Sequence, residues 1–264
     1  MTSHQRFYAA KLTPNQVKTS RQPMAIFLEI DDALDEDQKV WRYMDLAKFV
    51  SMLEQKALWL ARADTFRDRH EGRLPSEMRK FIEKAYEGFK VTDGSRVKDA
   101  DDFQDYLLKN TFISCWHGNL DENMVMWEIY GKNSSAVAVQ TTIREMKRSI
   151  DTSAMMGHSL LLKKVIYEKA DDVSGVLAYE ECFFRKRPHF SFEKEVRISL
   201  DTYTPSNPSK SGPCGHRLPV NVNEFIASIV VHPDSKQWFV DVVNSVATKY
   251  GIHAPIERGA YGNE

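Results

Sequence analysis

Cysteine and long hydrophobic runs are both scarce in this 264-residue sequence. The three cysteines, Cys115, Cys182 and Cys214, lie far apart and form no C-x-x-C pair, which argues against a disulfide framework and against a zinc site. No apolar run approaches the roughly 18 residues that cross a bilayer, and the N-terminus lacks the apolar core of a signal peptide. We therefore expect a cytoplasmic protein with no membrane segment.

An excess of charge of either sign is also missing. The 36 lysines and arginines nearly balance the 37 aspartates and glutamates, and the formal net charge is −1. Overall charge therefore predicts binding neither to nucleic acid nor to membranes. The sequence has no H-E-x-x-H motif either, so the zinc-protease signature is absent.

The hydrophobic pattern predicts an α+β protein. Strands are expected over residues 25–30, 39–44, 57–63, 111–118, 135–142, 190–202, 225–233 and 253–259, and one or two strands over residues 159–169. Helices are expected over residues 45–56, 75–89, 101–109, 121–131, 142–150, 173–187 and 235–251, with Asp45 as an N-cap and Gly131 and Gly251 as helix ends. Residues 204–217 are rich in Pro, Gly and Ser and are expected to form a loop.

The order of these elements favours one compact domain. Residues 1–22 are polar and are expected to form an irregular arm, whereas residues 23–264 show no internal repeat and no linker. We expect these residues to form a single α+β domain with mixed or antiparallel central sheets. We expect the helices between residues 73 and 110 to be an insertion into this domain.

Four stretches carry more polar side chains than a fold requires. They supply the candidate residues Arg42 and Tyr43 in the first stretch; Asp68, His70 and Glu71 in "FRDRHEG"; Ser114, Trp116, His117, Trp127 and Tyr130 in residues 113–131; and Glu193, Glu195 and Arg197 in "FEKEVRI". Each has a structural explanation as well: Asp68 suits a turn, and Trp127 with Tyr130 suits a core stripe. The functional explanation depends on their combination.

The stretch "FEKEVRI" (192–198) alternates like a strand. Phe192, Lys194, Val196 and Ile198 would lie on one side, and Glu193, Glu195 and Arg197 on the other. The polar side is either a solvated sheet face with a ladder of salt bridges or the acidic centre of a site.

Two kinds of site fit these residues. Asp68, His70, Glu71, Glu193 and Glu195 include the oxygen and imidazole ligands of a metal-dependent hydrolase or nuclease. Alternatively, an arginine holds the phosphates of a dinucleotide, and a carboxylate stabilises the oxocarbenium-like transition state when the N-glycosidic bond breaks. A second carboxylate two residues earlier would then orient the acceptor. A nucleophile pair of Cys115 and His117 is disfavoured, because a direct hydrogen bond is awkward between residues i and i+2 of a strand.

Several segments together resemble the bacterial family called domain of unknown function 2971. They are "VWRYMDLAKFVSMLEQKALWLARADTFRDRHEG", "FISCWHG…MVMWEIYGKNSSAVAVQ", "FEKEVRI" and "IASIVVHPDS", and they cover roughly residues 38–257. The order of an arginine strand, a serine strand and an E-x-E strand is also similar, more distantly, to the arginine–serine–glutamate class of ADP-ribosyltransferases, which have a split sheet.

The second resemblance implies an activity and a role for each candidate residue. Arg42, beside Tyr43, would hold the phosphates of the substrate NAD, Ser114 would brace the site, and Tyr130 or Trp116 would stack on nicotinamide. Glu195 would be catalytic, and Glu193 would direct the acceptor, a protein or a nucleic acid; no metal is assigned. The implied protein is an NAD-dependent enzyme, with a bacterial toxin or phage-defence effector as the biological setting.

Alternatives stay open at this point. One is the metal-dependent hydrolase or nuclease, which would use Asp68, His70, Glu71, Glu193 and Glu195; Asp68, His70, Glu71 and Arg197 are further candidate pocket residues whatever the activity. Another is a non-catalytic binding or regulatory module, in which E-x-E-x-R is a structural salt-bridge ladder. An unpaired strand would suit a homodimer, and a role in toxicity or defence would add an antitoxin or defence partner.

Overall fold

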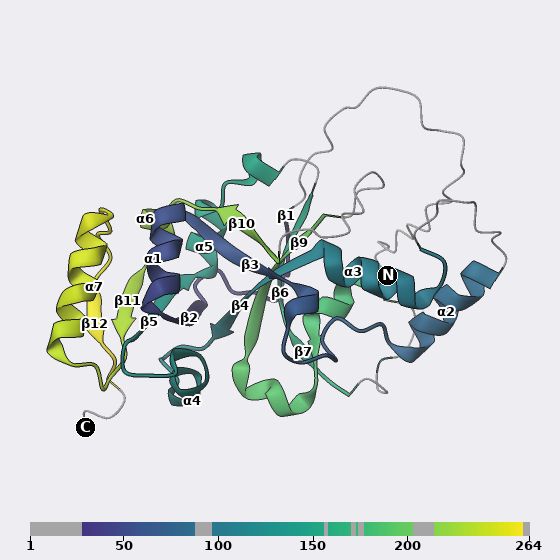
Figure 1. Ribbon diagram of the computed structural model, residues 1–264, viewed down its shortest axis with the longest axis horizontal. Coiled ribbons are helices and arrows are strands. Elements are labelled where there is room, and N and C mark those ends of the chain that lie inside the picture. The colour runs from purple at the N-terminus through teal and green to yellow at the C-terminus, as the bar shows by residue number, and fades with distance from the viewer. Residues whose placement is uncertain are drawn as a thin grey trace.

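Most strands of the computed structural model form one large sheet that helices flank (Figure 1). The structure describes residues 28–87, 97–155, 158–169, 173, 177–202 and 214–260. Within them the strands are β1 (Leu28–Ile30), β2 (Lys39–Asp45), β3 (Ala57–Arg62), β4 (Thr111–Gly118), β5 (Ala136–Thr142), β6 (Ser159–Lys164), β7 (Ile166–Tyr167), β8 (Arg185–Lys186), β9 (Glu195–Asp201), β10 (Gly215–Pro219), β11 (Ser228–Val231) and β12 (Ile256–Arg258). The predicted arm over residues 1–22 lies outside the described residues.

The sheet is mixed, and most of its neighbouring strands are antiparallel. Its order is β1-β6-β9-β4-β2-β5-β11-β12, and β3 joins it by pairing with both β4 and β10. The pairs β1/β6 and β11/β12 are parallel, whereas β7 and β8 form a separate two-stranded sheet. The predicted α+β class with a mixed central sheet is therefore confirmed.

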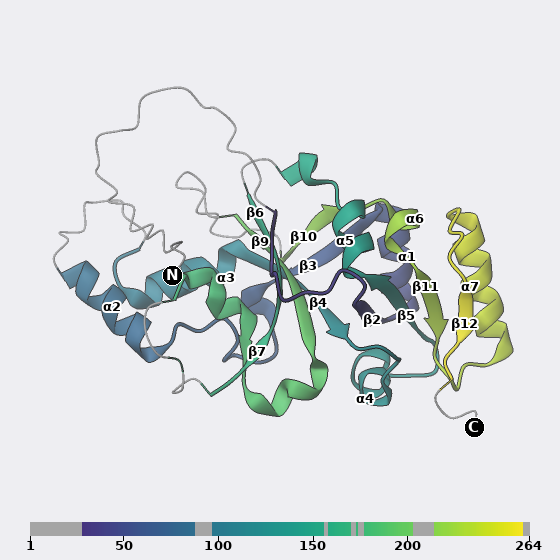
Figure 2. The ribbon, with the colours of Figure 1, turned by 180° about the vertical axis from the view of Figure 1, so that it is seen from behind.

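Five helices of the described residues lie close to their predicted ranges, one is much shorter than predicted and one was not predicted. The helices are α1 (Leu46–Gln55), α2 (Ser76–Glu87), α3 (Ala100–Asn110), α4 (Met124–Met126), α5 (Ile143–Ser149), α6 (Val222–Phe225) and α7 (Gln237–Lys249). The Asp45 side chain accepts a hydrogen bond from the backbone N–H of Lys48 and caps α1 as predicted. The inserted helices α2 and α3 lie at the end of the molecule opposite α7 (Figures 1 and 2). No helix in the described part of the chain is long and apolar enough to cross a membrane.

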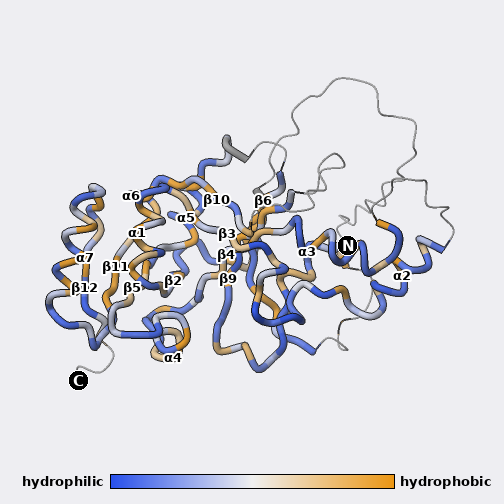
Figure 3. The backbone as a smooth tube through the Cα atoms, in the orientation of Figure 1, coloured by the Kyte–Doolittle hydropathy of each residue, from blue (hydrophilic) through white to orange (hydrophobic). Residues whose placement is uncertain are grey.

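Strand alternation separates two hydrophobic clusters on β4. Phe112 belongs to the main core with Val40, Leu58 and Ile198, which the buried sides of α1, α5, α6 and α7 complete. The next residue, Ile113, belongs to a second cluster that α2, α3 and residues 182–184 cover. Hydrophobic residues accordingly gather along the central strands, whereas hydrophilic ones prevail on α2 and the outer loops (Figure 3).

The sheet splits along one edge of β4. In the described residues β4 pairs with β2 only through Val40 and Trp41, and with β3 only through Ala61 and Arg62. Its other edge pairs with β9 over its length, from Thr111↔Asp201 to His117↔Glu195. Strands β2 and β3, which α1 connects, therefore diverge beside Ser114–Trp116 and leave a gap in the sheet.

Several predicted elements differ from the structure. The strand expected over residues 190–202 begins only at Glu195, because Pro188–Glu193 form a 3-10 helix that ends at Lys194 with a left-handed φ of 40°. The helix expected over residues 173–187 is, in its described part, a 3-10 helix over Tyr179–Phe184 followed by β8. Strand β10 occupies the end of the loop expected over residues 204–217.

The helix expected over residues 121–131 ends in an unexpected way. After α4 the chain makes a π-helical turn over Trp127–Gly131, and the left-handed cap is Lys132 with a φ of 64°. Space is tight at Gly131 instead, since a Cβ there would lie 3.2 Å from both the Ala136 Cβ and the Trp127 ring. The predicted glycine end of α7 is confirmed, because Gly251 has a φ of 68°.

Candidate functional site

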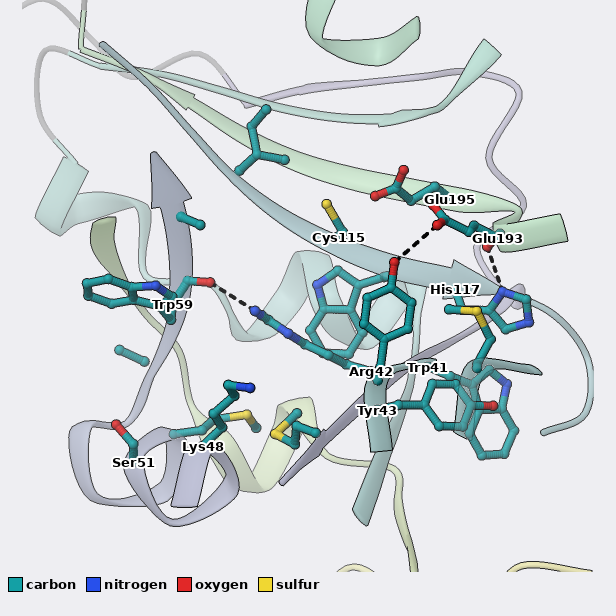
Figure 4. A pocket seen from close by; sticks show the side chains of 18 of the residues that line it. Trp41, Arg42, Tyr43, Lys48, Ser51, Trp59, Cys115, His117, Glu193 and Glu195 are labelled. Atoms are coloured by element: carbon teal, nitrogen blue, oxygen red, sulfur yellow. Dashed lines mark hydrogen bonds between the residues drawn. The ribbon is translucent and has the colours of Figure 1, made fainter. Parts of the chain in front are cut away.

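A cavity of about 500 Å³ lies in the split of the sheet. Its walls come from β2, α1, β3 and β4, together with Phe66, Met126, Tyr130, Glu193, Glu195 and Arg217. This volume is within the roughly 300–1,000 Å³ of small-molecule sites. Figure 4 shows Trp59 at one end of the cavity, Glu193 and Glu195 at the other, and Arg42 between them.

Arg42 bridges the gap between the diverging strands. Its Nη1 donates a hydrogen bond to the Ser114 Oγ at 2.5 Å, and its Nη2 donates one to the carbonyl of Trp59 at 3.2 Å. The guanidinium carbon lies 5.7 Å from the ring centroid of Trp116, whose Nε1 also donates to the Ser114 Oγ, at 3.1 Å. Ser114 is fully buried, so it fixes the two side chains that lie over it.

The positive charge of Arg42 has no carboxylate partner among the described residues. Both of its hydrogen bonds go to neutral oxygens, and burial lowers the pKa of its guanidinium. Arginine stays protonated nevertheless, because its ordinary pKa is above 12. A held and unneutralised guanidinium on a cavity wall is a site for an anion, above all for a phosphate or carboxylate.

Five buried charged side chains, two of which line the cavity, form a cluster that we call the carboxylate cluster: Glu71, Lys186, Glu193, Glu195 and Arg197. Each side chain is at most 9% exposed. The Lys186 Nζ lies 2.5 Å from a Glu193 oxygen, 3.4 Å from Glu71 and 3.5 Å from Glu195. Arg197 pairs with Glu195 at 2.7 Å and also with Glu71. Three carboxylates therefore face two cations.

The two glutamates of the cavity wall have different pKa values. Burial alone would raise the pKa of Glu195, but Arg197 and Lys186 hold it below its ordinary value. Burial raises the pKa of Glu193, and the ion pair with Lys186 offsets that rise only in part. The Tyr130 hydroxyl donates a hydrogen bond to Glu193 at 3.1 Å. Two neighbouring carboxylates whose pKa values are pushed apart suit two different roles.

Cys115 and His117 lie beside the glutamates without forming a nucleophile pair. Burial and the Glu195 carboxylate raise the pKa of the Cys115 thiol well above its ordinary value, so the thiol is protonated at neutral pH. The His117 Nδ1 donates to the carbonyl of Glu193 at 2.6 Å, and burial lowers the pKa of the ring. His117 is therefore a neutral ring that supports the turn before β9.

The structure brings most of the predicted site residues together. Arg42, Tyr43, Trp116, Tyr130, Glu193 and Glu195 line the cavity, and Ser114 reaches it through Arg42. Tyr130 is 40% exposed, whereas Trp116 is buried under Arg42, so of these two predicted stacking rings Tyr130 is the accessible one. Glu71 and Arg197 lie behind the glutamates as members of the carboxylate cluster.

Asp68 and His70 do not belong to the cavity wall. Asp68 accepts hydrogen bonds from Arg187, at 3.0 Å, and from the backbone N–H of His70, at 2.9 Å, so it shapes the turn as its structural explanation predicts. The side chain of His70 is exposed. In the described ranges no group of three or more His, Cys, Asp and Glu side chains is arranged to hold a metal ion. The ligand set that the hydrolase hypothesis requires is therefore not assembled.

Sequence reasoning missed Lys186, Trp59 and Arg217. Lys186 stands in the basic run "RKRPHF" (185–190), where its neighbour Arg185 pairs with Glu168 and Arg187 with Asp68. Trp59 and Arg217 face each other across the pair β3/β10, and β10 was expected to be loop. The alternation of "ALWLAR" (57–62) was a signal for Trp59, because it places the ring on the face opposite the two core leucines.

The comparisons with known proteins are sparse. No protein-family model matches the chain, so the resemblance to domain of unknown function 2971 is not confirmed, and no curated protein matches it either. Among solved structures the chain is similar to DarT of Thermus sp. 2.9 in complex with ADP-ribosylated ssDNA, with 9% identity, 86% of this chain and 95% of that chain covered, and a TM-score of 0.39. The chain is similar to the same protein in complex with NAD⁺ as well, with 8% identity, 85% of this chain and 96% of that chain covered, and a TM-score of 0.39. A likeness this distant carries no argument about the site.

Proposed function

We propose that this protein is an NAD-dependent enzyme of the ADP-ribosyltransferase type that modifies a macromolecule. The observation that carries the proposal is the pairing of an unneutralised guanidinium, Arg42, with the ionised carboxylate of Glu195 across one cavity. A phosphate needs the first group, and a developing oxocarbenium ion needs the second. The apolar side chains of a protein core supply neither a cation for a phosphate nor a carboxylate for an oxocarbenium ion.

The two ends of the cavity then have separate tasks. Arg42 binds the pyrophosphate of NAD, which directs the nicotinamide riboside toward Glu193 and Glu195. The bond between ribose C1′ and the nicotinamide nitrogen breaks, and its electron pair leaves with nicotinamide. Glu195, kept ionised by Arg197 and Lys186, stabilises the positive charge that develops on the ribose. The accessible ring of Tyr130 packs against the nicotinamide.

Glu193 acts on the acceptor in this scheme. Its raised pKa makes it a better base than Glu195, so it takes the proton of the attacking group as that group bonds to C1′. The acceptor is a protein or a nucleic acid. Digestion of the labelled lysate with a protease or with a nuclease distinguishes these two classes.

Release of nicotinamide tests the proposal directly. The purified protein is incubated with labelled NAD and cell lysate, beside Glu195→Gln and the control Glu168→Gln, whose carboxylate pairs with Arg185 outside the cavity wall. We expect turnover to fall about 10²- to 10³-fold in Glu195→Gln, as after loss of one group that stabilises a transition state, and to persist in the control. Circular dichroism verifies that both variants fold.

A non-catalytic module is the second candidate, and one observation favours it. Every carboxylate of the carboxylate cluster has a basic partner, as a purely structural network would. Folded wild-type protein that releases no nicotinamide in complete lysate would contradict the transferase and favour this candidate. The predicted homodimer, antitoxin partner and role in toxicity or phage defence stay predictions; size-exclusion chromatography and growth of cells expressing wild-type protein or Glu195→Gln test them.

A further inference from the structure

The end of the cavity farthest from the glutamates holds an aromatic ring that the proposed catalytic step does not use. Trp59 is 43% exposed although it lies on β3, next to the core. Alternation places Leu58 and Leu60 in the main core and Ala57, Trp59 and Ala61 on the cavity wall. The neighbours of Trp59 on this face of the strand, Ala57 and Ala61, have small side chains.

A glycine on the adjacent strand receives this indole. A Cβ at Gly215 would lie 2.1 Å from the Cζ2 and 2.4 Å from the Cε2 of Trp59. The ring therefore lies over the backbone of β10, in a space that only glycine leaves free. This contact fixes the position of a side chain that would otherwise rotate in solvent, and a fixed exposed ring can bind a second ring at little entropic cost.

Two arginines lie close to Trp59. Arg217 lies directly opposite Trp59 in the β3/β10 pair and also lines the cavity. Its side chain is exposed, and within the part of the chain that the structure describes it has no carboxylate in salt-bridge range. On the other side, the carbonyl of Trp59 accepts the hydrogen bond from Arg42. An aromatic ring flanked by two arginines without acidic partners suits a nucleotide, which offers both a flat base and a phosphate.

We propose that Trp59 is the stacking platform for the adenine of the dinucleotide, with Arg217 beside the adenosine phosphate. This inference rests on the proposed function, because Arg42 in the middle and the glutamates at one end leave the opposite end for the second base. It makes the cavity directional: nicotinamide lies at Tyr130 and Glu193, and adenine lies at Trp59. Gly215 acts through Trp59 and is a positioning residue.

Binding of the two halves of the dinucleotide tests the platform separately from catalysis. Adenosine monophosphate and nicotinamide mononucleotide are titrated by calorimetry into wild-type protein, Trp59→Ala, Trp59→Phe and the control Trp238→Ala, which removes an indole that is 60% exposed on α7. We expect Trp59→Ala to weaken binding of adenosine monophosphate roughly 5- to 100-fold. Trp59→Phe should restore much of the loss, and binding of nicotinamide mononucleotide should change less than about twofold in every variant.

A further variant moves the ring without removing it. The new Cβ in Gly215→Ala would also lie 2.7 Å from the carbonyl oxygen of Leu60, so the variant displaces the indole together with the adjoining backbone of β3. It should weaken binding of adenosine monophosphate as Trp59→Ala does, with folding verified by circular dichroism. Equal affinity of wild-type protein and Trp59→Ala for adenosine monophosphate, or equal losses for both mononucleotides, would overturn the platform. NAD turnover that is intact with an unchanged KM in Trp59→Ala would refute the platform and leave the transferase standing. Binding of adenosine monophosphate that depends on Trp59, without any NAD turnover, would refute the transferase and keep the platform.

Discussion

Replacement of Lys186 by methionine is expected to expose the energetic role of the carboxylate cluster. Methionine has a similar length and fits an apolar environment, but it leaves Glu71, Glu193 and Glu195 with Arg197 as their sole buried cation in the cluster. Lys186 is 9% exposed and its Nζ lies within 3.5 Å of all three carboxylates. Because removal of one partner of a buried ion pair leaves an uncompensated charge, we expect a loss of about 3–5 kcal/mol in the free energy of unfolding at neutral pH.

The sign of the pH dependence follows from Glu193. Burial already raises the pKa of Glu193, and loss of the Lys186 ammonium raises it further above the value in the unfolded chain. A carboxyl with a raised folded pKa stabilises the fold fully below its unfolded pKa, about 4.3, and loses that contribution as the pH rises through the folded pKa. The destabilisation by Lys186→Met should therefore be largest at neutral pH and should shrink as the pH falls toward that value.

Urea denaturation of both proteins at neutral and at mildly acidic pH measures this effect. The control is Lys48→Met, since Lys48 is 67% exposed in its pair with Asp45 and should change the free energy of unfolding by less than about 1 kcal/mol. A loss in Lys186→Met no larger than in the control, or a loss that grows in acid, would refute the reasoning from buried charge.

Two further predictions concern the side chains around Glu195. Glu193→Gln removes the carboxyl with the raised pKa. The acid limb of the pH profile for nicotinamide release should therefore move to lower pH, toward the lowered pKa of Glu195. An unmoved acid limb would show that the ionisation of Glu193 does not determine its position. The raised pKa of Cys115 predicts that iodoacetamide near neutral pH alkylates the exposed Cys214 long before Cys115, as peptide mass spectrometry can measure; equal rates would argue against a protonated thiol.

Local signals in the sequence were sufficient to predict β2, α1 and β4. The strand, cap and helix of residues 39–55 depend on Asp45 and on a hydrophobic stripe within one segment, and the structure confirms them as β2 and α1. Strand β4 has the predicted bounds for the same reason. These elements carry Arg42 and Ser114, so one side of the cavity could be predicted from residues that are close in sequence.

Nonlocal contacts decided the elements that were predicted wrongly. Cys182, Phe183 and Phe184 are consecutive and all buried, a pattern that fits no single helix face; the 3-10 helix buries them against the second cluster. Strand β10 pairs with β3, and Gly215 packs closely under Trp59 there; composition cannot indicate this nonlocal contact. The Trp59 end of the cavity was therefore hidden from sequence reasoning, although the alternation in β3 was visible.

The question of whether E-x-E-x-R is a solvated face or an acidic centre had no answer in the stretch itself, because the same alternation serves both. The answer depends on what covers the face. The turn that carries Glu71 and the segment that carries Lys186 pack over β9 and leave Arg197 fully buried. The salt-bridge ladder and the site are thus compatible: the pairing with Arg197 and Lys186 is what keeps Glu195 ionised despite its burial. Glu193 reaches the same cavity without belonging to the strand, because the left-handed turn at Lys194 returns its side chain toward Lys186. A carboxylate held by a turn can be adjusted independently of one held by a strand, which is a physical basis for two pKa values that differ across a spacing of two residues.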